Sequence, residues 1–149
     1  GTTFTVLFPS LGDAAPLLAP EPDAPWRATG TVLVADDEDI VRTLFAEHLR
    51  SIGFDVLLAA DGAEAVDLLR ADPARVTLVV LDRTMPRLSG EATFRELRRL
   101  RPDLPVILSS GNEDEAATRA LFAEGLSATL KKPYRRHDLV RTVRRVLEA

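Results

Sequence analysis

From residue 31 onward, short apolar runs alternate with longer stretches in which apolar residues recur every three or four positions. The short runs are rich in β-branched residues. Most of them are continuously apolar rather than alternating, which is typical of strands buried on both faces of a sheet. We therefore predict five strands, at about residues 31–35, 55–59, 77–81, 106–109 and 126–131.

The longer stretches carry the start and stop signals of amphipathic helices. Asp61 with Glu64 three positions later is typical of a capped helix start, and Gly53 and Gly125 follow helical stretches as stop signals. The predicted helices lie at about residues 38–51, 61–72, 90–100, 112–125 and 135–147. Strands that alternate with helices, joined by right-handed crossovers, predict an α/β fold: a doubly wound parallel sheet with helices on both faces.

The first 30 residues follow a different pattern. Residues 2–8 are β-branched and aromatic and favour a strand, which is not stable alone. Five prolines between Pro9 and Pro25 then indicate a semi-extended linker. Trp26 is either a tether that packs on the next domain or an exposed linker residue. We predict a strand in residues 1–9, a linker over 10–29 and a folded domain over 30–149.

Composition narrows the class of protein. The chain has 149 residues and a net charge of −4, which does not favour non-specific binding of nucleic acid. It has no cysteine, which excludes disulfides and thiolate metal sites and fits a reducing, cytoplasmic compartment. No apolar run reaches the ~18 residues of a membrane span, so we expect no membrane contact by this segment. The start at Gly1 predicts a piece cut from a longer protein.

Polar side chains follow four of the predicted strands at their carboxyl ends. Asp36 and Asp37 follow the first strand, Asp82 the third, Ser110 the fourth and Lys132 the fifth. Parallel strands end at one edge of the sheet, where open α/β folds bind their ligands, so we expect these groups to meet. Carboxylates gathered there repel one another and require a cation. With oxygen ligands only, the expected ion is Mg²⁺.

This arrangement predicts a phosphoryl acceptor. Asp82 is the expected nucleophile, which attacks a phosphoryl group and forms an acyl phosphate. We expect Mg²⁺ to be held by Asp37 and Asp82, with Asp36 acting through water and the main-chain carbonyl of Thr84 completing the shell. The groups expected to contact phosphoryl oxygens are Lys132 and Ser110. An acidic pair alone often only caps a helix, so the prediction rests on the whole set.

Residues 30–149 resemble a response-regulator receiver domain. The motifs that carry the resemblance are Val34-Ala35-Asp36-Asp37-Glu38, Asp82 with Met85-Pro86 and Gly90, Ser110-Gly111 and Lys132-Pro133. The resemblance implies a flavodoxin-like fold with strand order 2-1-3-4-5 and a cis peptide bond before Pro133. It also implies that Asp82 accepts the phosphoryl group from a phosphohistidine, that Ser110 is the switch hydroxyl and that Lys132 is the family's lysine.

The chain departs from the family at one position. Thr129 stands three residues before Lys132, where the family has an aromatic switch residue. This departure puts in doubt the coupling in which an aromatic ring swings inward behind the hydroxyl. Thr84 and Asn112 occupy positions that tune the lifetime of the phosphoryl group in the family, so we predict that they set rates here.

The first nine residues are similar to the last strand of a histidine-kinase ATP-binding domain. We therefore predict that residues 1–9 are a remnant of that domain and that the parent is a hybrid sensor histidine kinase, a phosphotransferase, with a carboxyl-terminal receiver. Its ATP site, its donor histidine and any membrane anchor are expected upstream. His48 and His137 lie on predicted receiver helices and are expected to be packed or solvated rather than donors.

Three alternatives remain open at this stage. The chain is a stand-alone response regulator if no kinase precedes it. It is a degenerate receiver, used only as an interaction module, if it binds no Mg²⁺. A haloacid-dehalogenase-type phosphatase also uses an aspartate nucleophile, but that class has a second acid two residues further on, where this chain has Thr84.

Overall fold

The computed structural model describes residues 28–111 and 115–148. The predictions for the strand in residues 1–9, for Trp26 and for Asn112 fall outside these residues, and the predicted linker falls outside them except for residues 28 and 29. They remain predictions. The folded domain predicted over residues 30–149 is described except for residues 112–114 and 149.

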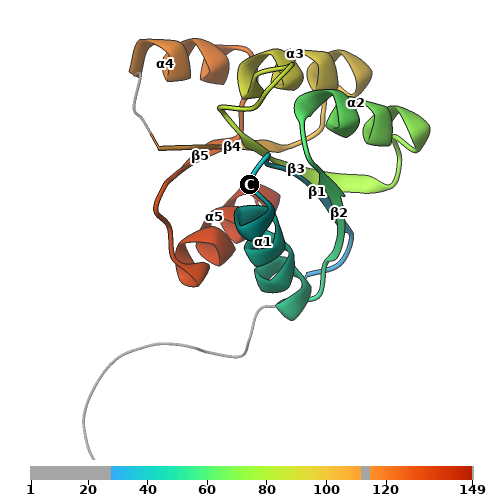
Figure 1. The fold of residues 1–149 in the computed structure, drawn as a ribbon, viewed down its shortest axis with the longest axis vertical. Helices are drawn as coiled ribbons and strands as arrows, with labels where there is room; N and C mark the ends of the chain where they lie inside the picture. Colours follow the sequence, from blue (N-terminus) through green and yellow to red (C-terminus); the bar gives the residue numbers. More distant parts are fainter. Residues whose placement is uncertain (1–27, 112–114, 149) are drawn as a thin grey trace, which may run out of the picture.

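The centre of the fold is a parallel sheet (Figure 1). In the described part of the chain it has five strands in the order β2-β1-β3-β4-β5, as predicted. Each neighbouring pair is parallel. The strands are β1 (Thr31–Ala35), β2 (Asp55–Ala59), β3 (Val76–Asp82), β4 (Val106–Ser110) and β5 (Ala128–Lys131).

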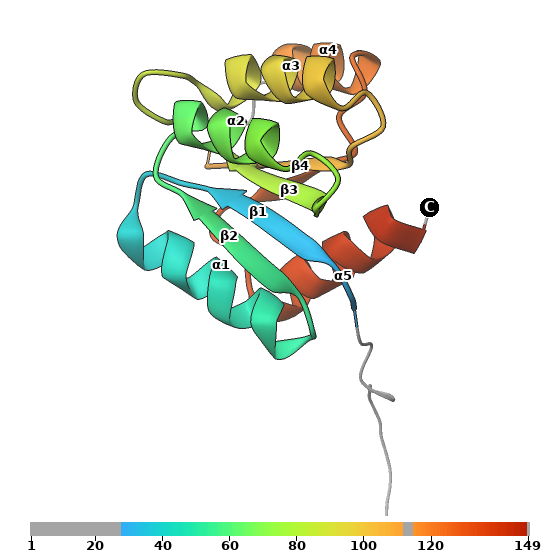
Figure 2. The same cartoon turned by 90° about the vertical axis from the view of Figure 1, so that its right-hand side faces the viewer.

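The helices cover both faces of the sheet, as Figures 1 and 2 show. Helices α2, α3 and α4 lie on one face and contribute Leu69, Phe94 and Leu121 to its core. Helices α1 and α5 lie on the other face, with Phe45 and Leu139 in a second core. Their bounds are α1 (Asp39–Ser51), α2 (Gly62–Ala71), α3 (Gly90–Leu100), α4 (Glu115–Ala123) and α5 (Arg136–Glu148). The predicted fold class is confirmed.

Two local signals from the sequence are also confirmed. Gly53 has φ of 114°, a left-handed conformation that glycine adopts without strain, and it lies just past the end of α1. The carboxylate of Asp61 accepts a hydrogen bond of 2.8 Å from the N–H of Glu64 and caps α2.

The predicted bounds of three strands need correction. The last strand was expected to begin at Leu126, but the N–H of Leu126 donates to the carbonyl of Leu121 and closes the end of α4, so β5 begins at Ala128. Strands β3 and β4 extend further than expected. Asp82 pairs with Ser109 across the sheet, so Asp82 and Ser110 are the last residues of their strands rather than the first residues after them.

Candidate functional site

Three carboxylates meet at the carboxyl edge of the sheet. Asp36 and Asp37 follow β1, and Asp82 ends the neighbouring strand β3. One carboxylate oxygen from each residue lies within 4.8 Å of the others. Asp36 and Asp82 are buried, whereas Asp37 is exposed. The structure therefore brings together the three acids that the sequence predicted, with two of them shielded from water and one open to it.

Lys132 lies between the two buried acids. Its ammonium Nζ donates to Asp82 Oδ1 at 3.1 Å and to Asp36 Oδ2 at 3.4 Å. It directly follows β5, and its N–H donates to the carbonyl of Ser110, which extends the pairing of β5 with β4 by one step. The next peptide bond, Lys132–Pro133, is cis, as the family resemblance implied.

The electrostatics of the site favour a bound cation. Burial raises the pKa of Asp82, and the charge of Asp36 raises it further, while Lys132 and the N–H of Thr84 act in the opposite direction. Burial opposes the charge of Lys132, but the two acids outweigh burial and raise the pKa of Lys132. One ammonium serves two buried carboxylates and a third lies close by, so the negative charge is only partly balanced.

The donor set fits Mg²⁺. Carboxylate oxygens are the ligands that Mg²⁺ prefers, and this ion keeps several waters, for which an open cavity leaves room. A cavity of about 590 Å³ lies over the site. Its lining includes Asp37, Asp82, Thr84, Ser110 and Lys132. The structure thus gathers the predicted hydroxyl, the ammonium and all the predicted metal ligands except the buried Asp36 around one space, and neither His48 nor His137 lines it.

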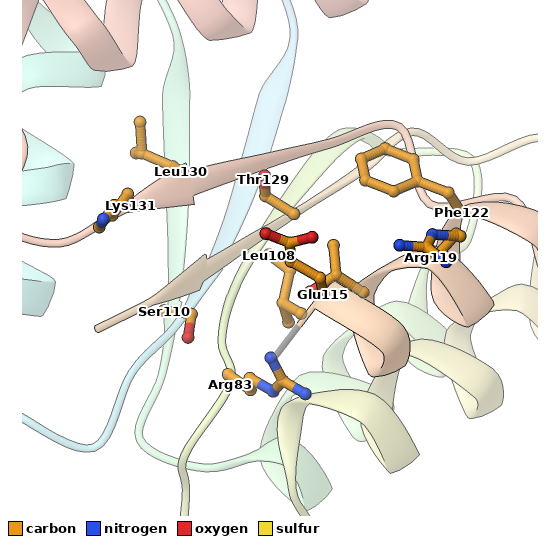
Figure 3. A pocket seen from close by; sticks show the side chains of 10 residues that line it. Arg83, Leu108, Ser110, Glu115, Arg119, Phe122, Thr129, Leu130 and Lys131 are labelled. Carbon is orange, nitrogen blue, oxygen red and sulfur yellow. The ribbon is translucent and has the colours of Figure 1, made fainter. Parts of the chain in front are cut away.

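A second cavity, of about 460 Å³, lies between α4 and strands β4 and β5 (Figure 3). Thr129 is exposed on β5 and faces this space, and α4 buries only Leu121 among its residues. Ser110 and Arg83 line both cavities. The position where the family has an aromatic switch residue therefore borders open space, and that space adjoins the acidic site through Ser110 and Arg83.

Sequence reasoning missed two features beside the site. Arg83 follows Asp82 directly, and its guanidinium pairs with Glu91 of α3 at 3.3 Å. Arg83 lines the cavity over the acids as well as the cavity beside α4. The second feature is an ion pair between Asp61 and Arg87, 26 residues apart. No local pattern in the sequence predicts this ion pair, because it forms only when α2 packs beside the β3–α3 loop.

Residues 32–144 match the family model described as the response regulator receiver domain. The chain therefore belongs to this family, whose members act in two-component signalling.

Two curated relatives differ in how much of the chain they match. The chain is 37% identical over 157 residues to the sensor kinase CckA of Brucella abortus (strain 2308), a match that covers 99% of the chain and 17% of the kinase. It is 36% identical over 116 residues to the response regulator MprA of Mycolicibacterium vanbaalenii, covering 78% of the chain and 49% of that protein. The chain thus spans half or less of these relatives.

Solved structures are similar over the same domain. A response regulator receiver domain protein from Clostridium thermocellum has a TM-score of 0.76 and 27% sequence identity, covering 80% of this chain and 94% of that one. The CheX–CheY complex with BeF3 and Mg²⁺ from Borrelia burgdorferi has a TM-score of 0.76 and 26% identity, covering 78% of this chain and 88% of that one. Among the described residues, no helix is both long and apolar enough to span a membrane.

Proposed function

We propose that this receiver domain takes a phosphoryl group from a phosphohistidine onto Asp82 with the help of Mg²⁺. The observation that carries the proposal is the cluster itself: three carboxylates within 4.8 Å of one another, with the Lys132 ammonium 3.1 Å from Asp82. A purely structural surface does not need two buried acids beside a third. The related CheX–CheY complex, described with BeF3 and Mg²⁺, supports the choice of ion.

The chemistry follows from the groups in place. A carboxylate oxygen of Asp82 attacks phosphorus and forms an acyl phosphate, while the P–N bond breaks and its electron pair stays on the histidine nitrogen. When bound, Mg²⁺ neutralises charge on the phosphoryl oxygens. Asp37, Asp82 and the main-chain carbonyl of Thr84 would hold the ion directly, and Asp36 would act through water.

Two further groups of the site act on the transferred phosphoryl group. Lys132 lies within reach of an oxygen of the group on Asp82 and balances its charge. Ser110 donates a hydrogen bond to another oxygen, and Thr84 sets how long the acyl phosphate survives. Asn112, which lies outside the described residues, shares that rate-setting role.

The parent is proposed to be a hybrid sensor histidine kinase. The match to the sensor kinase covers 99% of this chain and so extends into the residues before the receiver, whereas the match to the response regulator covers 78%. The donor histidine then belongs to the same parent chain or to a separate phosphotransfer protein. The receiver works on the cytoplasmic side and binds no nucleic acid. ATP-dependent phosphorylation of the full-length parent tests this origin, and a parent without kinase activity would favour a stand-alone regulator.

A small donor with a P–N bond tests the transfer directly. Phosphoramidate is added to the chain with Mg²⁺ and with EDTA, and ³¹P NMR follows the appearance of an acyl phosphate. The proposal predicts a signal with Mg²⁺ only, and none from the Asp82→Asn variant. A folded wild type that binds Mg²⁺ yet forms no acyl phosphate would contradict the proposal and favour a degenerate receiver that serves only for interaction.

A further inference from the structure

The loop between β3 and α3 determines where two groups of the proposed site lie. The N–H of Thr84 acts on the Asp82 carboxylate, and the Thr84 carbonyl is the proposed main-chain ligand of the ion. The base of this loop is closed by a hydrogen bond of 2.9 Å from the N–H of Gly90 to the carbonyl of Arg83. Met85 is buried in the core beneath α2 and α3. Further along, Leu88 packs against the same core and the Ser89 side chain caps α3, so the part of the loop that these contacts leave to be held from elsewhere is its tip, Pro86 and Arg87.

Arg87 at the tip of this loop reaches across to α2. Its guanidinium donates to Asp61 Oδ2, while Oδ1 of the same carboxylate accepts the N–H of Glu64 and caps α2. Asp61 is buried, and its pKa is lowered by the Glu64 N–H and by Arg87. A single carboxylate thus fixes the start of α2 with one oxygen and the tip of the loop with the other.

The backbone supports the same contact. Arg87 has φ of 68°, a left-handed conformation that non-glycine residues rarely adopt and that a surrounding structure must enforce. At Gly62, the first residue of α2, an added Cβ would clash with the Thr93 hydroxyl of α3 and lie 2.8 Å from the carbonyl oxygen of Leu88 in the loop. The start of α2 and the loop therefore approach so closely that only a glycine fits between them.

We propose that Asp61 and Arg87 form a brace that positions the β3–α3 loop for Mg²⁺ binding. Both are positioning residues: neither lines the cavity over the acids, and both act through the loop that carries Thr84. The inference rests on the proposed function, because it assumes that the ion binds at Asp82. Arg87 is exposed although Asp61 is buried, and an ion pair with an exposed partner couples weakly, so the expected loss of Mg²⁺ affinity is about two- to fivefold.

The brace is distinguishable from a through-space charge effect by the sign of the change. Removing the negative charge of Asp61 would by charge alone weaken binding of a cation, and removing the positive charge of Arg87 would strengthen it. The brace predicts weaker binding in both variants, because each one releases the same loop. Opposite signs for the two variants would refute it.

The test measures the Mg²⁺ Kd of the full chain by isothermal titration calorimetry. Asp61→Asn keeps a capping side chain, and Arg87→Asn keeps a residue that tolerates positive φ, so both variants lose the ion pair with little other change. We expect both to raise the Kd about two- to fivefold. The double variant should lose no more than either single one, because both changes break one contact. Arg87→Lys should restore most of the affinity.

A matched control and a metal-free readout complete the experiment. Arg70→Gln removes an ion pair within α2, with Asp67, in which both partners are exposed, and should leave the Kd unchanged. Without Mg²⁺, amide hydrogen exchange at Leu88 and Gly90 should accelerate in both brace variants. A lowered melting temperature with an unchanged Kd and unchanged exchange would show a purely structural pair and overturn the brace. If the wild type binds no Mg²⁺, the proposed function fails, and the exchange comparison alone decides whether the pair holds the loop.

Discussion

Replacing Asp82 with asparagine should stabilise the metal-free fold even as it abolishes the proposed chemistry. Asp82 lies within 4.8 Å of two other carboxylates, and each pair at that distance repels by about 3.5 kcal/mol at an effective dielectric of 20. Lys132 at 3.1 Å offsets about 5 kcal/mol at the same dielectric. Because Asp37 is exposed and water screens it, these charge interactions nearly cancel. The burial of Asp82 then decides the balance: it raises the pKa of the carboxyl and disfavours its charged form, at a cost on the order of 1 kcal/mol.

Thermal unfolding in EDTA measures this effect. A gain of about 1 kcal/mol corresponds to a rise of about 4 °C in the melting temperature of a domain of this size. With saturating Mg²⁺ the wild type should have the higher melting temperature, because the ion stabilises it by its binding free energy and binds the Asp82→Asn variant more weakly. Asp67→Asn, which replaces an exposed acid on α2, is the control and should change the melting temperature neither in EDTA nor in Mg²⁺.

The pH dependence gives an independent check on the same charge. The folded-state pKa of Asp82 lies above its ordinary value of 3.8. Its protonation therefore contributes stability that is fully present below pH 3.8 and is lost as the pH rises through the folded-state pKa. The advantage of Asp82→Asn in EDTA should thus be largest at neutral pH and shrink on acidification. A variant less stable than the wild type at neutral pH in EDTA, or stabilised equally by Mg²⁺, would refute the reasoning.

Two further substitutions test neighbouring parts of the site. Gly90→Ala should destabilise the fold by about 1–3 kcal/mol in urea unfolding, since its Cβ would lie 2.4 Å from the Asp82 carbonyl oxygen, whereas Gly111→Ala, with no atom within 4 Å, should be neutral. A tolerated Gly90→Ala would contradict the close approach. Ser110→Ala should leave Asp82 open to phosphorylation but weaken the change in amide exchange of α4 that follows it. An equal response in wild type and variant would exclude Ser110 from the switch.

Most of the fold could be predicted from the sequence because the patterns that determine its strands and helices are local. Continuous apolar runs such as residues 77–81 need burial on both faces, and only a parallel sheet between helix layers provides it. The Asp61 cap and the Gly53 stop depend on a few neighbouring residues and were likewise predictable. The boundary at Ala128 was not, because the apolar run from Leu126 does not show that the N–H of Leu126 closes α4.

The acids of the candidate site were predictable for a topological reason. Parallel strands share one edge, so Asp36 and Asp82 had to converge once the sheet order was known. The pairing of Arg87 with Asp61 depends instead on the distance between α2 and the β3–α3 loop, which no sequence pattern fixes. The open space beside Thr129 could not be predicted for the same reason, since the exposure of the Thr129 side chain depends on how α4 packs.

The most direct test of the central claim is the intact mass of the protein after incubation with Mg²⁺ and acetyl phosphate. Wild type, Asp82→Ala and an Asp67→Asn control are compared, with the fold of each checked by circular dichroism. The proposed function predicts a single phosphoryl adduct on wild type and control, none on Asp82→Ala, and none on any of them in EDTA. An adduct that persists on Asp82→Ala, or a folded, Mg²⁺-bound wild type that stays unmodified by both acetyl phosphate and phosphoramidate, would contradict Asp82 as the acceptor.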